Sequence, residues 1–188
     1  MIYLWGVSGK LSNVLGYEGT IKTRHIKLGD KVHKACRICF SSEEMCKDLI
    51  KLGAVINKSL ILKYPTKSQV PTHLLRHFDR GYVDGDGHIC LTSKFKEGIA
   101  YHFSLLGTYE LLDSMVERLY KDKIINRRYD MIKKDKRRID VNNFYIAFNG
   151  ENARRTIVHL YDNSNIYLDR KYEVAEGLIA KEVVKFGE

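Results

Sequence analysis

The chain has 188 residues, of which 44% are hydrophobic, and it carries a formal net charge of +9. This hydrophobic share is enough for a buried core, and the length allows one large or two small domains. No segment is long and apolar enough to cross a membrane, so we expect a cytoplasmic, nucleoid-associated protein with no membrane partner. The positive charge is clustered along the chain, which favours a polyanionic partner.

Two strands and a helix are expected in the first part of the chain. Residues 37–43, RICFSSE, lead into a helical run that ends at Leu52. A hairpin upstream of them carries Lys22, Arg24 and Lys27. Because these cations gather on one hairpin, we expect it to contact a polyanion.

A short junction between two parts of the chain is expected at residues 64–71, because the chain has two prolines and no linker rich in serine or glycine. We therefore divide the chain into residues 1–69 and residues 70–188. Pro71 suits the first turn of a helix that ends near Gly85.

One face of this helix carries small residues one helical turn apart. Gly81 and Gly85 lack side chains, so a second helix can approach closely there, and Phe78 lies on the same face. Asp86 would then meet its counterpart near the crossing point. Two carboxylates forced together repel unless a cation neutralises them. The pattern FDRGYVDGDG, residues 78–87, therefore predicts a divalent-metal site at a helix interface.

Two other structures can contain an Asp-Gly-Asp-Gly run. A calcium-binding loop with Gly87 at its sixth position would need an acid at Tyr82 and a glutamate at Ser93, and neither is present. A plain Asp-Gly hairpin turn is the simpler alternative, but the glycine-containing helix before it favours the metal site.

Strands and helices alternate after the motif. The expected strands are 88–95, 100–106, near 125–132 and 139–148, and the expected helices are 109–122, 151–161 and 170–184. A strand–turn–strand segment among them places seven cations within twelve residues. These are Arg127, Arg128, Lys133, Lys134, Lys136, Arg137 and Arg138. With Lys94 in the first strand, they are expected to bind DNA, although a solvated basic turn is the alternative.

The two parts also show an internal repeat. Residues 37–43 parallel residues 145–151, YIAFNGE, at an offset of 108, and each segment precedes a helical run. Apolar positions further upstream match at an offset of 104. Because 86 − 104 = −18, the motif acid of the first repeat would lie about 18 residues before Met1. We therefore expect the first repeat to be incomplete.

The motif and its surroundings resemble the LAGLIDADG family of homing endonucleases, in which a helix, an acid and a strand follow in this order. The resemblance implies an α+β fold of αββαββα repeats whose sheets form a saddle on double-stranded DNA. It also implies hydrolysis of phosphodiester bonds in duplex DNA with Mg²⁺ or another divalent cation, and a role in intron or intein mobility.

The resemblance assigns Asp86 as a catalytic residue and metal ligand, with the backbone carbonyl of Gly85 beside it. Lys171, within YLDRKY at residues 167–172, is similar to a basic residue near the family's active site. Its implied role is to position solvent or to stabilise charge on the phosphate. An ordinary cation in a first helical turn is the alternative for Lys171.

A single motif in the chain leaves three possibilities: a truncated N-terminus, a decayed enzyme, or a homodimer in which two copies of Asp86 meet. The first and third keep the endonuclease function. The second gives an inactive relic, a DNA-binding regulator or a splicing cofactor on the same fold. A basic RNA-binding protein would account for the charge but not for the glycine-containing helix.

Overall fold

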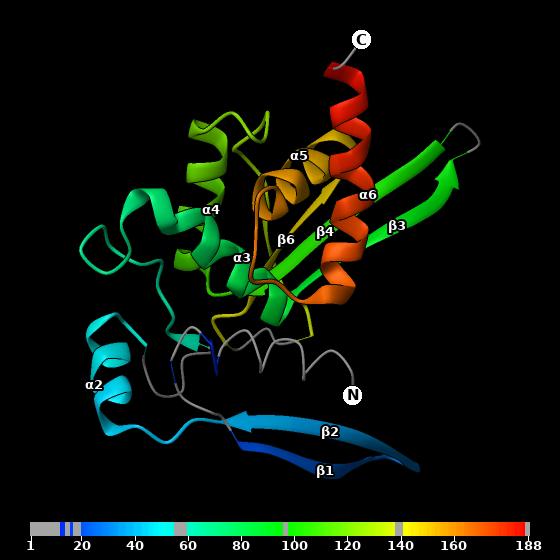
Figure 1. Cartoon of the computed structure of the whole chain (residues 1–188). Helices are drawn as coiled ribbons and strands as arrows, with labels where there is room; N and C mark the ends of the chain where they lie inside the picture. The colour runs from blue at the N-terminus through cyan, green and yellow to red at the C-terminus, as the bar shows by residue number, and fades with distance from the viewer. Residues whose placement is uncertain are drawn as a thin grey trace.

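The computed structural model describes residues 12–13, 16, 20–54, 60–95, 98–137 and 141–186. In the first part, β1 (Thr20–Leu28) and β2 (Lys31–Cys39) form a two-stranded antiparallel sheet, and α2 (Glu43–Lys51) follows (Figure 1). Gly29 has a φ of 59°, which suits the tight turn between the strands. The two strands and the helix expected here are confirmed.

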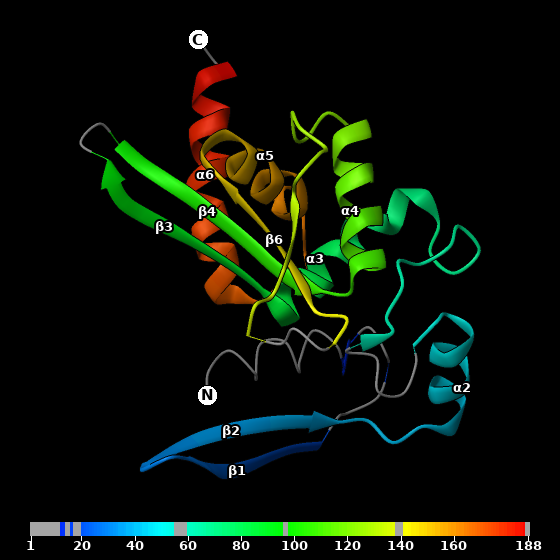
Figure 2. The same cartoon turned by 180° about the vertical axis from the view of Figure 1, so that it is seen from behind.

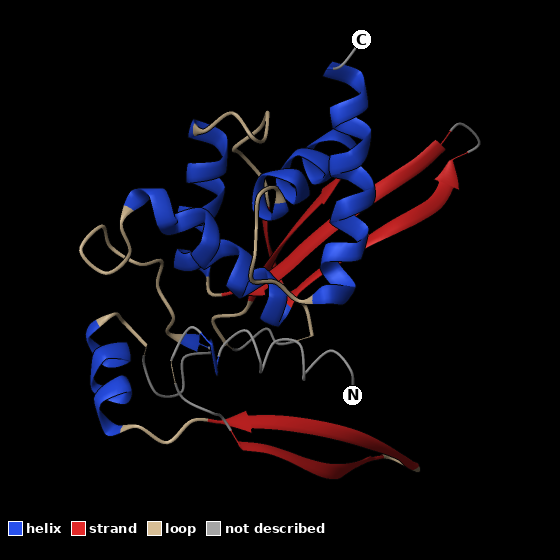
Figure 3. Ribbon diagram, in the orientation of Figure 1, coloured by secondary structure: helices blue, strands red, loops and turns tan. Residues whose placement is uncertain are grey.

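A four-stranded antiparallel sheet forms the centre of the second part. Its strands are β3 (Gly87–Phe95), β4 (Gly98–Gly107), β5 (Ile132–Lys134) and β6 (Phe144–Asn149), arranged in the order β3-β4-β6-β5. The longest strands, β3 and β4, are consecutive in the chain, as Figure 3 shows. This sheet does not share a strand with the β1–β2 sheet among the described residues.

The helices of the second part gather on one face of this sheet. They are the short η2 (Thr72–Leu74), α3 (Leu75–Asp86), α4 (Tyr109–Lys121), α5 (Gly150–Tyr161) and α6 (Asp169–Phe186). Seen from behind, β3, β4 and β6 lie in front of α5 and α6 (Figure 2). No helix of the described chain covers that side, which we call the helix-free face. The expected α+β class is confirmed by this arrangement.

Alternating side chains explain why one face of the sheet is covered and the other is not. Phe103 and Leu105 of β4 and Ile146 and Phe148 of β6 are each at most 2% exposed, and they contact the helices as part of the core. Phe103 and Phe148 stack with their ring centres 5.4 Å apart. The residues that alternate with these four along β4 and β6 point to the opposite side of the sheet, because side chains alternate along a strand.

The expected boundaries hold for the helices better than for two of the strands. The strand expected over residues 125–132 begins only at Ile132, and the one expected over 139–148 begins only at Phe144. Lys123 and Asp130 have φ values of 58° and 57°, so the backbone before β5 turns instead of extending. None of the described helices is long and apolar enough to cross a membrane.

Buried polar contacts hold α3 against its neighbours. Asp79 is 1% exposed and forms an ion pair with Arg118 of α4, and the Tyr64 hydroxyl donates to it at 3.0 Å. Burial raises the pKa of Asp79, and Arg118 opposes that shift. On another side of α3, Arg80 donates to the backbone carbonyl of Ile166 at 2.9 Å. The orientation of α3 is therefore set by charged groups that need specific partners.

We predict that Arg118→Met lowers the free energy of unfolding by about 3–5 kcal/mol, because it leaves the Asp79 carboxylate buried without its cation. Urea denaturation would measure the loss. Asp79→Asn added to this variant should restore part of the stability, since it removes the unpaired charge. If the double variant loses as much stability as the sum of the losses in the two single variants, the ion pair does not have this role.

Candidate functional site

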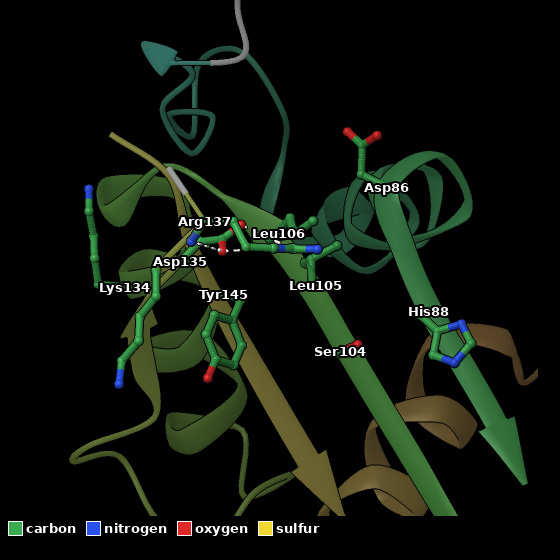
Figure 4. A pocket seen from close by; sticks show the side chains of 10 residues that line it. Asp86, His88, Ser104, Leu105, Leu106, Lys134, Asp135, Arg137 and Tyr145 are labelled. Carbon is green, nitrogen blue, oxygen red and sulfur yellow. Dashed lines mark hydrogen bonds and ion pairs between the residues drawn. The ribbon is translucent and has the colours of Figure 1, made fainter. Parts of the chain in front are cut away.

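Asp86 is the last residue of α3, and its side chain is exposed. It lies at the edge of a cavity of about 410 Å³, and its carboxylate projects from the end of the helix (Figure 4). The other lining residues come from β3, β4, β6, the end of β5 and the segment after it: His88, Ser104, Leu105, Leu106, Lys134, Asp135, Lys136, Arg137 and Tyr145. The fold thus brings the motif acid close to part of the basic segment predicted from the sequence.

Lys171 holds the backbone at the end of α3. Its side chain is buried, and its Nζ donates to the carbonyls of Val83, Asp84 (3.0 Å) and Gly87 (2.5 Å). These carbonyls lie at a helix C-terminus, where a cation is favourable and where carbonyls lack partners within the helix. The contacts support a role for Lys171 in positioning Asp86. Lys171 as a residue is 1% exposed, and its implied action on a phosphate stays a prediction.

Asp84 differs from Asp86 although both belong to the motif. The Asp84 carboxylate accepts hydrogen bonds from the Tyr161 hydroxyl at 2.6 Å and from the backbone N–H of Leu168 at 3.1 Å. Burial raises the pKa of Asp84. Residues two positions apart point to different sides of a helix. Asp84 therefore bonds to neighbouring elements of the protein, whereas Asp86 points to the cavity.

The glycine face of α3 is open. A Cβ atom placed on Gly81 or on Gly85 would meet no atom within 4 Å apart from the helix's own backbone. Phe78 is half-buried and packs edge-on against Tyr64, with ring centres 5.7 Å apart. A second helix therefore has room at the two glycines, and the expected interface there stays a prediction.

The structure divides the predicted basic residues into two groups. Lys22 and Lys27 of β1 and Arg127, Lys133 and Lys136 of the second part are exposed. Arg137 is also largely exposed, but its guanidinium bonds to both oxygens of Asp135 at 3.0 Å. The hydrogen bond from Arg137 lowers the pKa of Asp135. These six cations are the ones most available to a polyanion.

Two other cations of the basic segment have partners within the protein. Arg128 forms ion pairs with Asp113 and Glu117 of α4, the latter at 2.7 Å. Lys134 donates to the carbonyl of Val141 and lies 4.5 Å from the centre of the Phe144 ring. Their predicted DNA contacts would require these interactions to break.

Three predicted DNA-binding side chains are not placed by the structure. Arg138 lies outside the described residues, as do the side chains of Arg24 and Lys94.

A second hollow of about 280 Å³ lies along the end of β6. Its lining includes Arg127, Lys133 and Asn149, together with Asn126 and Asn152. Sequence analysis found the two cations but missed Asn149 and Asp135, because neither is part of a recognisable motif. The β5–β6 register brings Asn149 to the strand beside Lys133, whereas Asp135 is adjacent in sequence to Lys134 and Lys136.

One chain supplies part of a divalent-cation site. A cation such as Mg²⁺ takes oxygen ligands, and the exposed Asp86 carboxylate with the Gly85 carbonyl offers two. The described residues contain no group of three or more His, Cys, Asp or Glu side chains arranged to hold a metal. The donor set therefore fits the ion only if further ligands come from a second motif helix or from a phosphate.

We predict that Lys171 gives stability a specific pH dependence. Burial lowers the pKa of Lys171 from 10.5 to about 8. Between these values the unfolded chain binds more protons at Lys171 than the folded chain does, so the free energy of unfolding rises with pH across this window. Urea denaturation of the wild type and Lys171→Met should show the wild type gaining stability relative to the variant from pH 8 to 10.5. A constant difference would contradict the prediction.

No family model and no curated protein sequence matches the chain. Two solved structures are similar to it at low scores. One is the homing endonuclease I-CvuI in complex with the I-CreI target in the presence of magnesium, with the DNA not cleaved. It has 12% identity and a TM-score of 0.37, and the match covers 56% of this chain and 66% of that one, a little under two thirds. The other is a point mutant of I-SmaMI, with 13% identity, a TM-score of 0.39, and coverage of 95% and 84%.

The fold assignment rests on the chain itself. The motif lies on α3, its acid is exposed at the helix end, and the elements that follow are β3, β4, α4, β5, β6 and α5, with α6 after them. Residues 75–161 therefore have the αββαββα order that was expected from the sequence, and α6 follows.

Proposed function

We propose that the chain binds double-stranded DNA on the helix-free face of its four-stranded sheet and hydrolyses phosphodiester bonds with a divalent metal at Asp86. One observation carries the proposal: the exposed Asp86 carboxylate shares a cavity with Lys136 and Arg137. Cations beside a carboxylate suit a site that must hold both a phosphate and a metal ion.

Charge supports DNA as the partner. The net charge of +9 would attract a polyanion, and exposed cations lie at both ends of the basic segment, at Arg127 and Lys136. The helix-free face between them carries small and polar side chains, among them Ser104 and Ala147. Such a surface lets a duplex approach the strands, with the cations placed to contact its backbone.

Asp86 and the Gly85 carbonyl would hold Mg²⁺ in this proposal. When bound, the ion activates water and stabilises the leaving oxygen. Lys171 fixes the backbone on both sides of Asp86 through its bonds to the Asp84 and Gly87 carbonyls. The carboxylate thus starts from a constrained backbone, which reduces the ordering needed when a metal binds.

A second Asp86 would complete the site, and the open glycine face offers a way to bring it there. In a homodimer, the α3 helices of two chains would cross at Gly81 and Gly85, where an added Cβ would meet no atom of another described segment within 4 Å. The two carboxylates would then lie close to each other, and the metal would offset their repulsion. We propose this homodimer as the active species.

The alternative is a DNA-binding protein that does not cut. It is favoured by the incomplete metal site within one chain, where the described residues offer no group of three metal-binding side chains. Both functions use the same DNA-binding face. They differ only in whether a second motif acid reaches Asp86.

We predict that Asp86→Asn keeps DNA affinity within about twofold and abolishes Mg²⁺-dependent cleavage, because the substitution removes a metal-binding charge from an exposed side chain. Gel-shift titration and sequencing of cut ends from a genomic DNA pool would measure both. Asp48→Asn on α2 removes the same charge from an exposed position away from the cavity and is the control. Equal cleavage by wild type and Asp86→Asn would refute the enzyme proposal, and binding without cleavage by the wild type would favour the alternative.

We predict that Gly81→Val prevents dimer formation but does not destabilise the single chain. The added side chain has open space within the chain but would block a crossing helix. Sedimentation and thermal denaturation would separate the two effects. Gly177→Val on α6 is the matched control, since a Cβ there also meets nothing within 4 Å. Unchanged association of the Gly81 variant would exclude this interface.

A further inference from the structure

Asn149 occupies an N-cap position but does not act as an N-cap. It ends β6 and precedes the first residue of α5, with φ −130° and ψ 162°. Asparagine is favoured there because its side chain accepts a hydrogen bond from a backbone N–H in the first helical turn. In this chain the side chain makes no such bond. The amide is therefore turned away from the helix that it usually serves.

His102 holds the Asn149 amide instead. The two residues face each other directly in the β4–β6 register, and Nδ1 of His102 lies 2.8 Å from Oδ1 of Asn149. Their strand neighbours Phe103 and Phe148 are buried in the core. Because side chains alternate along each strand, His102 and Asn149 project onto the helix-free face.

The surroundings leave this pair accessible. Cys90 lies opposite His102 on β3, and Ser104 and Ala147 form the next cross-strand pair on the same face. These three neighbours are shorter than the pair and do not cover it. His88 of β3 lies beside His102 on the same face, with ring centres 6.0 Å apart, on the side of His102 away from Asn149. Asn149 is exposed on this face, at the edge of the sheet's polar surface.

The amide keeps the groups needed for a two-point contact. An asparagine side chain has an oxygen with two acceptor positions and a nitrogen with two donated hydrogens. His102 uses one of these four, whichever way the amide is turned. At least one oxygen acceptor position and one N–H therefore remain for a ligand. Adenine presents the complementary pair in the major groove, a donor at N6 and an acceptor at N7.

Cations that suit backbone contacts lie beside Asn149. Arg127 and Lys133 share the hollow of about 280 Å³ with it, and both are exposed. Phosphate contacts set the position of a protein on the duplex, while base-edge contacts select sequence. The two kinds of contact are next to each other here.

We propose that Asn149 reads an adenine in the major groove and that His102 is the positioning residue that orients its amide. This inference rests on the proposed DNA binding and adds one sequence-specific contact to it. It does not depend on cleavage or on a metal ion.

The test is selection of bound sequences from a randomised duplex pool without divalent metal. Wild-type chain should enrich adenine at one position by about 10-fold or more over other bases. Asn149→Ala should lose that preference and keep the others. Asn149→Asp, which only accepts hydrogen bonds, should move the preference towards cytosine. His102→Leu should weaken the adenine preference, and His102→Gln should retain much of it.

A modified base gives the sharpest measurement. Replacing the selected adenine by 7-deazaadenine removes N7, so wild-type affinity should fall by about 10-fold while that of Asn149→Ala stays unchanged. Arg127→Ala is the control, since loss of a phosphate contact should weaken all sequences alike. Equal losses in wild type and Asn149→Ala would overturn the assignment but leave DNA binding intact. Failure of the folded wild-type chain to bind any duplex would overturn both proposals.

Discussion

The internal pairing of the charged residues on α3 determines which of them remain available for function. Asp79 bonds to Arg118 and Tyr64, Arg80 to backbone carbonyls, and Asp84 to Tyr161. Lys171 then binds the carbonyls at the helix end. Each of these contacts is costly to leave unmade in a buried site, so together they fix the rotation of the helix. Asp86 and the two glycines are left pointing outward.

The sequence predicted this site to the extent that local patterns determine it. Helical spacing placed Gly81 and Gly85 on one face, and the position of Asp86 at the helix end followed from the glycines around it. In the structure both glycines and Asp86 are exposed, and the helix interface and the metal site stay predictions. The features that sequence analysis missed are contacts between segments that are distant in the sequence. Arg128 is held by α4, and the His102–Asn149 contact needs the β4–β6 register.

The repeat relates the first part to the second but also shows how they differ. At the offset of 108, Leu49 and Leu52 of α2 correspond to Ile157 and Leu160 of α5. The α5 residues are 0% exposed, whereas Leu49 is 44% and Leu52 is 50% exposed. α5 packs against β4, α6 and α3, and the first part has no matching set among its described elements. The apolar side chains of α2 are thus exposed where those of α5 are buried, and the incomplete first repeat over residues 1–69 stays a prediction.

The most direct test of the account is a crystal structure of the chain on a duplex that it binds, grown with Mn²⁺ so that anomalous scattering locates the ion. The account predicts DNA on the helix-free face and an anomalous peak bound by Asp86 oxygens from two chains beside a phosphate. DNA on the helix side of the sheet, or a peak away from Asp86, would contradict it.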